Sequence, residues 1–553
     1  MKKIWIIIAL CLCLLISGCD RATPPETTVG SEIATQEQTQ PSAPEQTDAP
    51  EIATQPSEKQ TEPATQPQTP VDPSQCTNHV DAENDGRCDV CDTIVIVAID
   101  FYNINDLHGK LADGENHPGV DELSTYLKQE KNLNDHVVLT SSGDMWQGQA
   151  ESNLTQGLII TDWMSSMGFS GMALGNHEYD WGAKPVQANS NQAEFPLLGI
   201  NVYDRGTDTR VDYCRSSVMI ERGGIQIGII GAIGDCYSSI SAEKVQDIYF
   251  KTGDALTRLV KAESDNLRSQ GADVIVYLIH DGYEQGTSSV KNVHSGNLKY
   301  YYDMSLSDGY VDLVFEGHTH QKYILKDEYG VYHLQCGGDN SSGISHVELS
   351  VNTANGSVKT RLAEHVPVSA YMPLAGDPIV EQLLQKYDET VSVSKEVLGY
   401  NFTNRTSRYL CQKVAQLYYQ KGVELWGNDY NIVLGGGFFS IRSPYTLPAG
   451  DVTYGQLQSL FPFDNDLVLC SIQGRDLKER FVETDNDRYY IYCGDYGTEV
   501  CRNIDPNATY YVIVDSYTSV YSPNNLTEIA RYQTGLYARD FLADYIKQGG
   551  FEG

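Results

Sequence analysis

The stretch GNHEYD at residues 175–180 determines how the rest of the chain is interpreted. It follows a short apolar run, residues 172–174, which is typical of a buried strand bounded by turn residues. An amide (Asn176), an imidazole (His177) and a carboxylate (Asp180) are thus expected just past a strand end. Four other short polar motifs stand in the same relation to an apolar run, and they make chemical sense only together with this one.

The four companion motifs are spread along the first two thirds of the chain. They are NDLHG at 105–109 after the run 94–99, GDMWQG at 143–148 after 137–139, HDG at 280–282 after 274–279, and GHTH at 317–320 after 311–315. Taken singly, Asn-Asp, Gly-Asp and Asn-His are common turn sequences. Their ordered occurrence at five strand ends favours a site, because ligands bind at the rim of open α/β sheets, where the loops converge.

The side chains at these five points form a set of oxygen and nitrogen donors without thiolates. Such a set suits borderline divalent metals such as zinc, manganese or iron. It contains too many donors for one tetrahedral ion. Two adjacent metals that share one carboxylate would use them all. The donors are Asp106, His108, Asp144, Asn176, His280, His318 and His320.

In order and spacing, these motifs resemble the calcineurin-like metallophosphatases, and specifically the 5′-nucleotidase and UDP-sugar hydrolase family. The resemblance is strong over residues 94–365 and continues more weakly to the end. It implies an α/β fold, namely a two-sheet metallophosphatase sandwich with helices outside, followed by a smaller α/β C-terminal domain. Apolar spacings of three and four at residues 120–131 and 255–268 predict helices that pack on such sheets.

The resemblance also assigns roles to the residues. It implies that Asp106, His108 and His320 bind the first metal, that Asn176, His280 and His318 bind the second, and that Asp144 bridges both. His177 and Asp180 match the family's catalytic pair. Two cations about 4 Å apart activate a bridging water and clamp the oxygens of an in-line phosphoryl displacement. Asp180 would orient the His177 ring and favour its imidazolium, which stabilises charge on the phosphate or protonates the leaving oxygen.

The chain begins with features of a secreted lipoprotein. A basic start, a short apolar run and small residues before Cys19 are typical of a signal peptide over residues 1–18, and its end resembles a bacterial lipobox. This resemblance implies acylation of Cys19 and a lipid-anchored protein on the extracellular face of a bacterial membrane. An ordinary signal peptide with an incidental cysteine is the alternative. Residues 19–75, rich in Thr, Gln and Pro, predict a disordered spacer.

A cysteine and histidine cluster follows at residues 76–92. Cys76, His79, Cys88 and Cys91 form two pairs of donors, each separated by two residues, which is the spacing of a tetrahedral structural zinc knuckle. A disulfide between two of the three cysteines is the alternative, because thiols outside the cell are oxidised unless a metal protects them. The acidic residues between the pairs weakly suggest a calcium loop, but full EF-hand spacing is absent. A catalytic role is not expected here.

The second half of the chain predicts a linker helix within residues 366–397 and a substrate-specificity domain over residues 398–553. The resemblance implies that Phe463 stacks on a substrate base and that Arg442 contacts phosphate or sugar. The family's glycine-rich aromatic motif is replaced by SYTSVY at 516–521, so the second stacking partner is Tyr517 or Tyr521. Either tyrosine packed on a strand is the structural alternative. Cys493 and Cys501 are close enough in sequence for a local disulfide.

Composition limits the partners. The 553 residues support two sizeable domains plus a tail, and a formal net charge of −35 argues against nucleic-acid polymers as partners. No protein partner is evident from the sequence. The prediction is a 5′-nucleotidase that hydrolyses small nucleotide phosphate esters with two divalent metal ions. Alternatives are a nucleotide-sugar pyrophosphatase, a 2′,3′-cyclic-nucleotide phosphodiesterase or an inactive binding lipoprotein.

Overall fold

Strand β1 (Ile96–Ile104) lies near the middle of the first of two six-stranded sheets. The computed structural model describes residues 72–113, 118–282, 310–327, 329–437, 441–442, 446–482, 490–493, 503–520 and 525–551. Residues 1–68 and 69–553 form separate units, and every described residue belongs to the second unit. In the described part of the chain, no helix is both long and apolar enough to cross a membrane.

The two sheets are built mainly from parallel strands. The first has the order β14 (Val358–Val366), β13 (Ile344–Asn352), β1, β2 (Val137–Ser141), β3 (Gly171–Ala173) and β4 (Leu197–Leu198). The second has the order β11 (Lys322–Lys326), β12 (Tyr332–Cys336), β10 (Leu313–Phe315), β9 (Val274–His280), β7 (Ile225–Ile233) and β6 (Ser217–Arg222). Strands β1, β2 and β3 run parallel, as do β7, β9 and β10. Their carboxyl ends therefore lie at one edge of each sheet.

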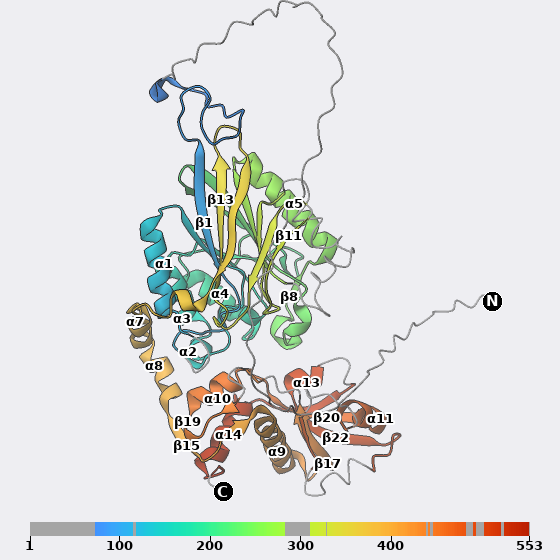
Figure 1. Cartoon of the computed structure of the whole chain (residues 1–553). Coiled ribbons are helices and arrows are strands. Elements are labelled where there is room, and N and C mark those ends of the chain that lie inside the picture. Colours follow the sequence, from blue (N-terminus) through green and yellow to red (C-terminus); the bar gives the residue numbers. More distant parts are fainter. Residues whose placement is uncertain are drawn as a thin grey trace, which may run out of the picture. The chain divides into compact units, whose positions relative to one another are not determined.

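Successive side chains of a strand point to opposite faces of its sheet. They therefore form one apolar core between the two sheets and a further core on the outer face of each sheet. Ile99 and Phe101 of β1 pack between the sheets against Val276 and Leu278 of β9, whereas Tyr102 of β1 faces outward. Helix α1 (Asp121–Leu133) follows β1, helices α2 (Ala150–Leu154) and α3 (Leu158–Met167) follow β2, and α4 (Ala183–Gln192) follows β3 (Figure 1). Helix α5 (Gly253–Ser269) precedes β9. Apolar residues of α1 and α3 cover the outer face of the first sheet, and those of α5 cover the second.

This arrangement confirms the expected two-sheet sandwich with helices outside. Helices α1 and α5 confirm the two predicted from apolar spacing. A short pair, β5 (Val202–Asp204) and β8 (Ile248–Phe250), completes this region.

Within the predicted linker, residues 366–397, the helical segment is interrupted. The segment forms α7 (Ile379–Lys386), α8 (Asp388–Val391) and a 3-10 turn (Ser392–Lys395) before β15 (Val397–Asn401) begins. Tyr387 breaks the helix with φ −102° and ψ 12°. Its hydroxyl donates to Asp162 of α3 at 2.7 Å, so a tertiary contact overrides the helical pattern.

A five-stranded sheet forms the core of the C-terminal region. Its order is β21 (Tyr490–Tyr492), β17 (Ile432–Gly437), β22 (Thr509–Asp515), β20 (Leu467–Gln473) and β23 (Thr527–Tyr532). Helix α9 (Ser407–Trp426), capped by Thr406, packs on β17. The other helices among the described residues of this region are α10 (Tyr454–Leu460), α11 (Gly474–Leu477), α13 (Ser516–Val520) and α14 (Ala538–Lys547). Strand β15 pairs with β19 (Gly450–Thr453), and β16 (Arg405–Thr406) pairs with β18 (Thr446–Leu447).

Direct contacts join this region to the two-sheet sandwich. The Ala150 amide donates to the Ser459 hydroxyl at 3.1 Å, and the Asn153 side chain donates to the Gln458 carbonyl at 3.3 Å. Arg531 of β23 pairs with Glu243, with one contact of 2.7 Å. These contacts bring the loop after α10, which carries Phe463, to the rim of the two sheets.

Candidate active site

All five motifs lie at or directly after the carboxyl end of a strand. Asp106 and His108 follow β1, Asp144 follows β2, Asn176 follows β3, His280 is the last residue of β9, and His318 and His320 follow β10. The strands expected before each motif are therefore confirmed. Several of the loops are locally strained: five of the seven expected donors have a left-handed backbone, a conformation that non-glycine residues adopt rarely and that concentrates at functional sites. They are Asp106, His108, Asp144, His318 and His320, with φ between 50° and 73°.

A first group of donors surrounds Asp106. The Nε2 atoms of His108 and His320 are 3.0 Å apart, and His320 Nε2 lies 3.3 Å from Asp106 Oδ1. Asp106 and His108 are fully buried, while the His320 side chain is 35% exposed. The Asp106 carboxylate is held in place by the His318 amide at 3.0 Å and by the Asn105 side chain at 2.7 Å. This group is open on the side of His320.

A second group surrounds His280 and is linked to the first through Asp106. His280 Nε2 lies 3.1 Å from Asp144 Oδ2 and 3.1 Å from Asn176 Oδ1. His318 Nδ1 lies 2.8 Å from the same Asn176 oxygen. Asp106, Asp144 and His280 also place their ligand atoms within 4.8 Å of one another. The seven side chains expected to act together thus form two overlapping groups.

The tautomers of two histidines fit metal ligation. His108 Nδ1 lies 2.9 Å from the Gln147 carbonyl, and His280 Nδ1 lies 2.8 Å from the Ser142 carbonyl. Because a carbonyl oxygen only accepts, each Nδ1 must carry a proton and donate it. In the neutral ring the Nε2 lone pair then points into the donor cluster, which is the arrangement of a metal-binding histidine whose other nitrogen is fixed by a backbone oxygen.

The electrostatics of the cluster favour a cation. Burial alone would raise the pKa of Asp144, but His280 and His177 outweigh it and hold that pKa well below its usual range. Burial opposes charge on His280, yet Asp144 raises the pKa of that imidazole to about 10. The field that stabilises a proton on a buried imidazole also attracts a divalent cation. The donor chemistry and the field therefore both fit divalent metals.

Glu178 is a residue that sequence reasoning missed. Its buried carboxylate accepts hydrogen bonds from the amides of Gly175 at 2.7 Å and of Asp144 and Met145 at 2.9 Å each. Burial and then the charge of Asp144 raise the pKa of Glu178 to about 8. Glu178 thereby ties the motif after β3 to the motif after β2. Its place inside the GNHEYD stretch was the one available signal.

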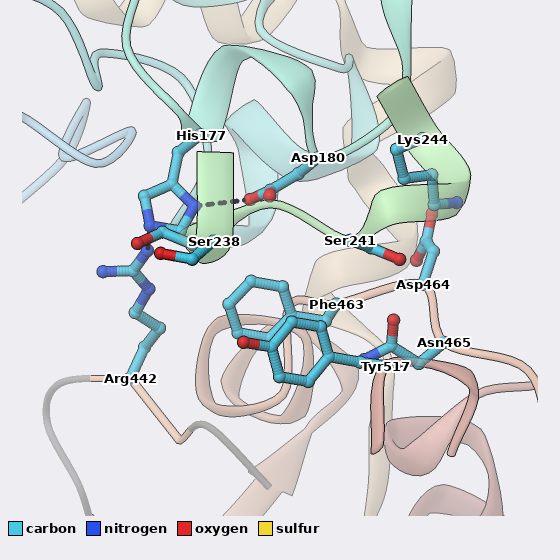
Figure 2. A pocket seen from close by; sticks show the side chains of 11 residues that line it. His177, Asp180, Ser238, Ser241, Lys244, Arg442, Phe463, Asp464, Asn465 and Tyr517 are labelled. Carbon is cyan, nitrogen blue, oxygen red and sulfur yellow. Dashed lines mark hydrogen bonds and ion pairs between the residues drawn. The ribbon is translucent and has the colours of Figure 1, made fainter. Parts of the chain in front are cut away.

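His177 and Asp180 meet as predicted. His177 Nδ1 lies 2.7 Å from Asp180 Oδ2 (Figure 2). The His177 amide donates to Asp144 Oδ1 at 2.8 Å. His177 Nε2 is 4.0 Å from Asp144 Oδ2, so the ring stands beside the donor groups. Arg442 reaches this point from the C-terminal region, with its Nη2 atom 2.6 Å from His177 Nε2 and its Nη1 atom 3.4 Å from His108 Nε2. The guanidinium for which the resemblance implies a phosphate or sugar contact therefore lies at this site.

A pocket of about 300 Å³ opens beside His177 and Asp180. Phe463 and Tyr517 turn their rings into it (Figure 2). The Phe463 ring centroid is 6.1 Å from that of His177 and 5.9 Å from the Arg442 guanidinium carbon. Of the two tyrosines considered from the sequence, Tyr517 lines this pocket, and Tyr521 lies outside the described residues. Sequence reasoning also missed the polar lining, which comprises Ser238, Ser239, Ser241, Lys244, Asp464 and Asn465.

The cysteines divide into three kinds. Cys214, Cys236 and Cys336 are buried and free, and Cys236 lies close to His280 and His318. Cys493 is disulfide-bonded, and Cys501 lies outside the described residues. Cys19, the predicted acylation site, also lies outside them. Cys76, Cys88 and Cys91 form a separate group with His79.

Comparison with known proteins agrees with this geometry. Residues 99–322 match the calcineurin-like phosphoesterase family, so the chain carries a calcineurin-like phosphoesterase domain, and its homologues are metallophosphoesterases, a class of hydrolases that use divalent metals. Within that class, the chain is a homologue of the UshA and 5′-nucleotidase proteins. It is 23% identical over 502 residues to protein UshA of Yersinia enterocolitica, covering 80% of this chain and 88% of the relative.

A second relative and a solved structure extend the comparison. The chain is 24% identical over 430 residues to a 5′-nucleotidase of Diplobatis ommata, which covers 69% of this chain and 70% of the relative. The crystal structure of a 5′-nucleotidase precursor from Thermus thermophilus superposes with a TM-score of 0.60 at 19% identity, covering 82% of this chain and 96% of the other. At that identity the superposition supports the fold alone, including the sandwich followed by a C-terminal domain.

Proposed function

We propose that this protein is a 5′-nucleotidase that removes phosphate from small nucleotides at a two-metal site. The observation that carries the proposal is a pocket with two chemically different walls. One wall holds His177 and Asp180 beside the metal-donor groups, and the other holds the rings of Phe463 and Tyr517. The first wall suits a phosphate group and the second suits a base, and a nucleotide contains both.

The donor groups would hold two divalent ions, with Asp144 contributing to both. The first ion would be bound by Asp106, His108 and His320, and the second by Asn176, His280 and His318. When bound, such ions supply an activated water and neutralise charge on the phosphoryl group. Asn176 contributes a neutral oxygen, so the occupied site keeps positive charge for an anionic substrate. The identity of the ions, zinc, manganese or a similar metal, is left to measurement.

The chain's own residues then handle the phosphate and the leaving oxygen. His177 is fixed by Asp180 on Nδ1 and presents Nε2 to the pocket, where it would donate a proton to the leaving oxygen or a hydrogen bond to the phosphate. Arg442 places a guanidinium beside the same nitrogen. Guanidinium groups bind phosphate oxygens through two parallel hydrogen bonds, so Arg442 would orient the phosphoryl group. Phe463 and Tyr517 would stack on the base.

The test measures phosphate release with manganese or zinc across AMP, ATP, UDP-glucose, a 2′,3′-cyclic nucleotide and an aryl phosphate. Strong preference for nucleoside monophosphates is expected. Preference for UDP-glucose or for the cyclic nucleotide would move the assignment to a nucleotide-sugar pyrophosphatase or a phosphodiesterase. Turnover of the aryl phosphate alone would keep the metal site and reject the nucleotide assignment. No turnover with any metal would favour a binding protein.

A further inference from the structure

A second cluster of metal-binding side chains lies far from the active site, in the segment before β1. We call residues 76–92 the knuckle. Its Cys76 and Cys88 sulfur atoms are 3.8 Å apart, and Cys91 Sγ lies 3.4 Å from His79 Nδ1. The ligand atoms of all four residues lie within 4.8 Å of one another. Cys88 and Cys91 are buried, and Cys76 and His79 are half-buried.

These distances distinguish between the chemistries that the sequence left open. Sulfur atoms in a disulfide are about 2.0 Å apart, much closer than Cys76 and Cys88. Ligands at about 2.3 Å from a tetrahedral zinc ion place two sulfur atoms about 3.8 Å apart. The observed sulfur separation matches the zinc geometry, and the shorter sulfur-to-nitrogen distance is the one expected when an imidazole replaces a thiolate. We infer that Cys76, His79, Cys88 and Cys91 bind one structural zinc ion.

The neighbouring side chains support this set of ligands. The Thr93 hydroxyl lies 3.3 Å from the Cys91 sulfur, where it can donate to a thiolate. Four protein ligands complete a tetrahedron and leave no position for water or substrate, so the site is structural.

A calcium loop at the same place is not favoured. Asp81, the first acidic residue of the loop, is 4% exposed, and its two oxygens accept from the amides of Asp85 and Gly86 at 3.0 Å each. The Asn352 side chain adds a third donor at 2.6 Å. These donors satisfy the Asp81 carboxylate without a cation and shape the turn that brings the two ligand pairs together.

The ion would fasten the knuckle to the catalytic sandwich. The Val95 amide donates to the Gly86 carbonyl at 3.0 Å, and Cys88, Cys91 and Val95 pack together against Ala354 in the turn after β13. These contacts lie at the amino end of β1, whereas Asp106 and His108 follow its carboxyl end. The length of a nine-residue strand, about 30 Å, separates the two sites. Loss of the knuckle ion should therefore leave catalysis intact.

The first test needs no variant. The full chain, purified without chelator or reductant, is treated with a thiol alkylating reagent before and after zinc chelation, and its zinc content is measured. We expect Cys76, Cys88 and Cys91 to resist alkylation until the chelator is added. A disulfide among them, seen as protection that only a reductant removes, would overturn the proposal. Rapid alkylation of all three without chelator would also overturn it.

The second test compares variants with a matched control. Cys88→Ser should lose one zinc per chain and the thiolate-to-cobalt charge-transfer absorbance of cobalt-substituted protein. Cys470→Ala, which removes a buried free cysteine of β20, should change neither. His79→Cys should keep the zinc, because it exchanges one ligand type for another. It is the control for substitution within the knuckle, since a ligand is changed there without being removed. Equal zinc content in Cys88→Ser and the unmodified chain would contradict the proposal.

Discussion

The active site and the knuckle are both clusters of side chains that could hold metal ions, but they are assembled in different ways. The active site gathers donors from loops after five strands, so that His108 and His320 meet although 212 positions separate them. The knuckle gathers Cys76 and Cys88 from positions only 12 apart. The active site offers oxygen and nitrogen donors and is open at His320, whereas the knuckle offers three sulfurs and is closed. The geometry of the active site therefore depends on the fold of the whole sandwich, whereas the geometry of the knuckle depends on one short segment.

The largest expected effect comes from removing the shared carboxylate. Asp144→Ala should lower kcat/KM for AMP by roughly a thousandfold, because both ions lose a ligand and several kcal/mol of transition-state stabilisation with it. Steady-state kinetics at saturating metal measure this. Cys88→Ser is the matched control, and it should stay within about twofold of the unmodified chain. Equal losses in both variants would show that the two clusters are not independent.

The next effect separates the catalytic pair from the metal ligands. His177→Asn should lower kcat about a hundredfold with AMP, since proton donation by a positioned side chain contributes that order of magnitude. The loss should be smaller for an aryl phosphate, whose leaving oxygen needs less protonation. Metal content, measured by elemental analysis, should stay unchanged. A parallel loss of metal would assign His177 to the ligands and contradict its proposed role.

A smaller effect is expected at the aromatic wall. Phe463→Ala should raise KM for AMP by about tenfold, since stacking contributes about 1 to 3 kcal/mol per base. The aryl phosphate, which has no base, should be hydrolysed as before. Phe402→Ala removes an aromatic ring that is 62% exposed and is the matched control. Unchanged KM for AMP in Phe463→Ala would reject the base platform while leaving the phosphatase assignment in place.

The smallest expected effect concerns the rigidity of the rim. His333 is buried between Glu316 at 2.9 Å and Asp327 at 3.2 Å, and Glu316 directly follows β10 on the way to His318. Burial opposes its charge, but hydrogen bonds to Asp327 and Glu316 raise the pKa of His333. A raised folded-state pKa contributes stability that is complete below the unfolded value, about 6.5, and is lost as pH rises through the folded value.

His333→Gln should therefore lower the free energy of unfolding by about 1 to 2 kcal/mol near pH 6, and by less at higher pH. Thermal unfolding of the two proteins across this pH range measures the difference. A difference in the free energy of unfolding that grows with rising pH would contradict the expected pH dependence. The knuckle should keep its zinc in this variant, because His333 contacts none of the ligands.

The sequence predicted those parts of the site that depend on local pattern. An apolar run that ends at a polar motif marks a strand end wherever it occurs, so the positions of Asp106, Asp144 and His280 followed from short segments. Parallel strands then bring their ends together. Two histidines outside the motifs, His333 and His346, each form an ion pair with a carboxylate away from the pocket. Such pairing is typical of structural residues.

The remaining features depend on packing between distant segments. The family resemblance assigned Arg442 to the substrate, but neither sequence neighbourhood contains a signal for its contact with His177, 265 positions away. Glu178 bonds amides of another loop, and backbone amides leave no trace in a sequence. The linker helix breaks because Tyr387 contacts α3, a tertiary event that overrides helical spacing. The choice of Tyr517 as the aromatic that lines the pocket likewise depends on how the C-terminal region meets the sandwich.

The left-handed backbone at Asp106, His108, Asp144, His318 and His320 limits how this site can be re-engineered. Aspartate and histidine are among the few side chains that tolerate this conformation, so the residue types proposed to bind the metals are also those that the loops can accommodate. Replacing His108 or His320 by cysteine to select a softer metal would add conformational strain to the change of ligand. Redesign toward thiolate-preferring metals is better directed at Asn176 or His280, where the backbone lies outside the left-handed region.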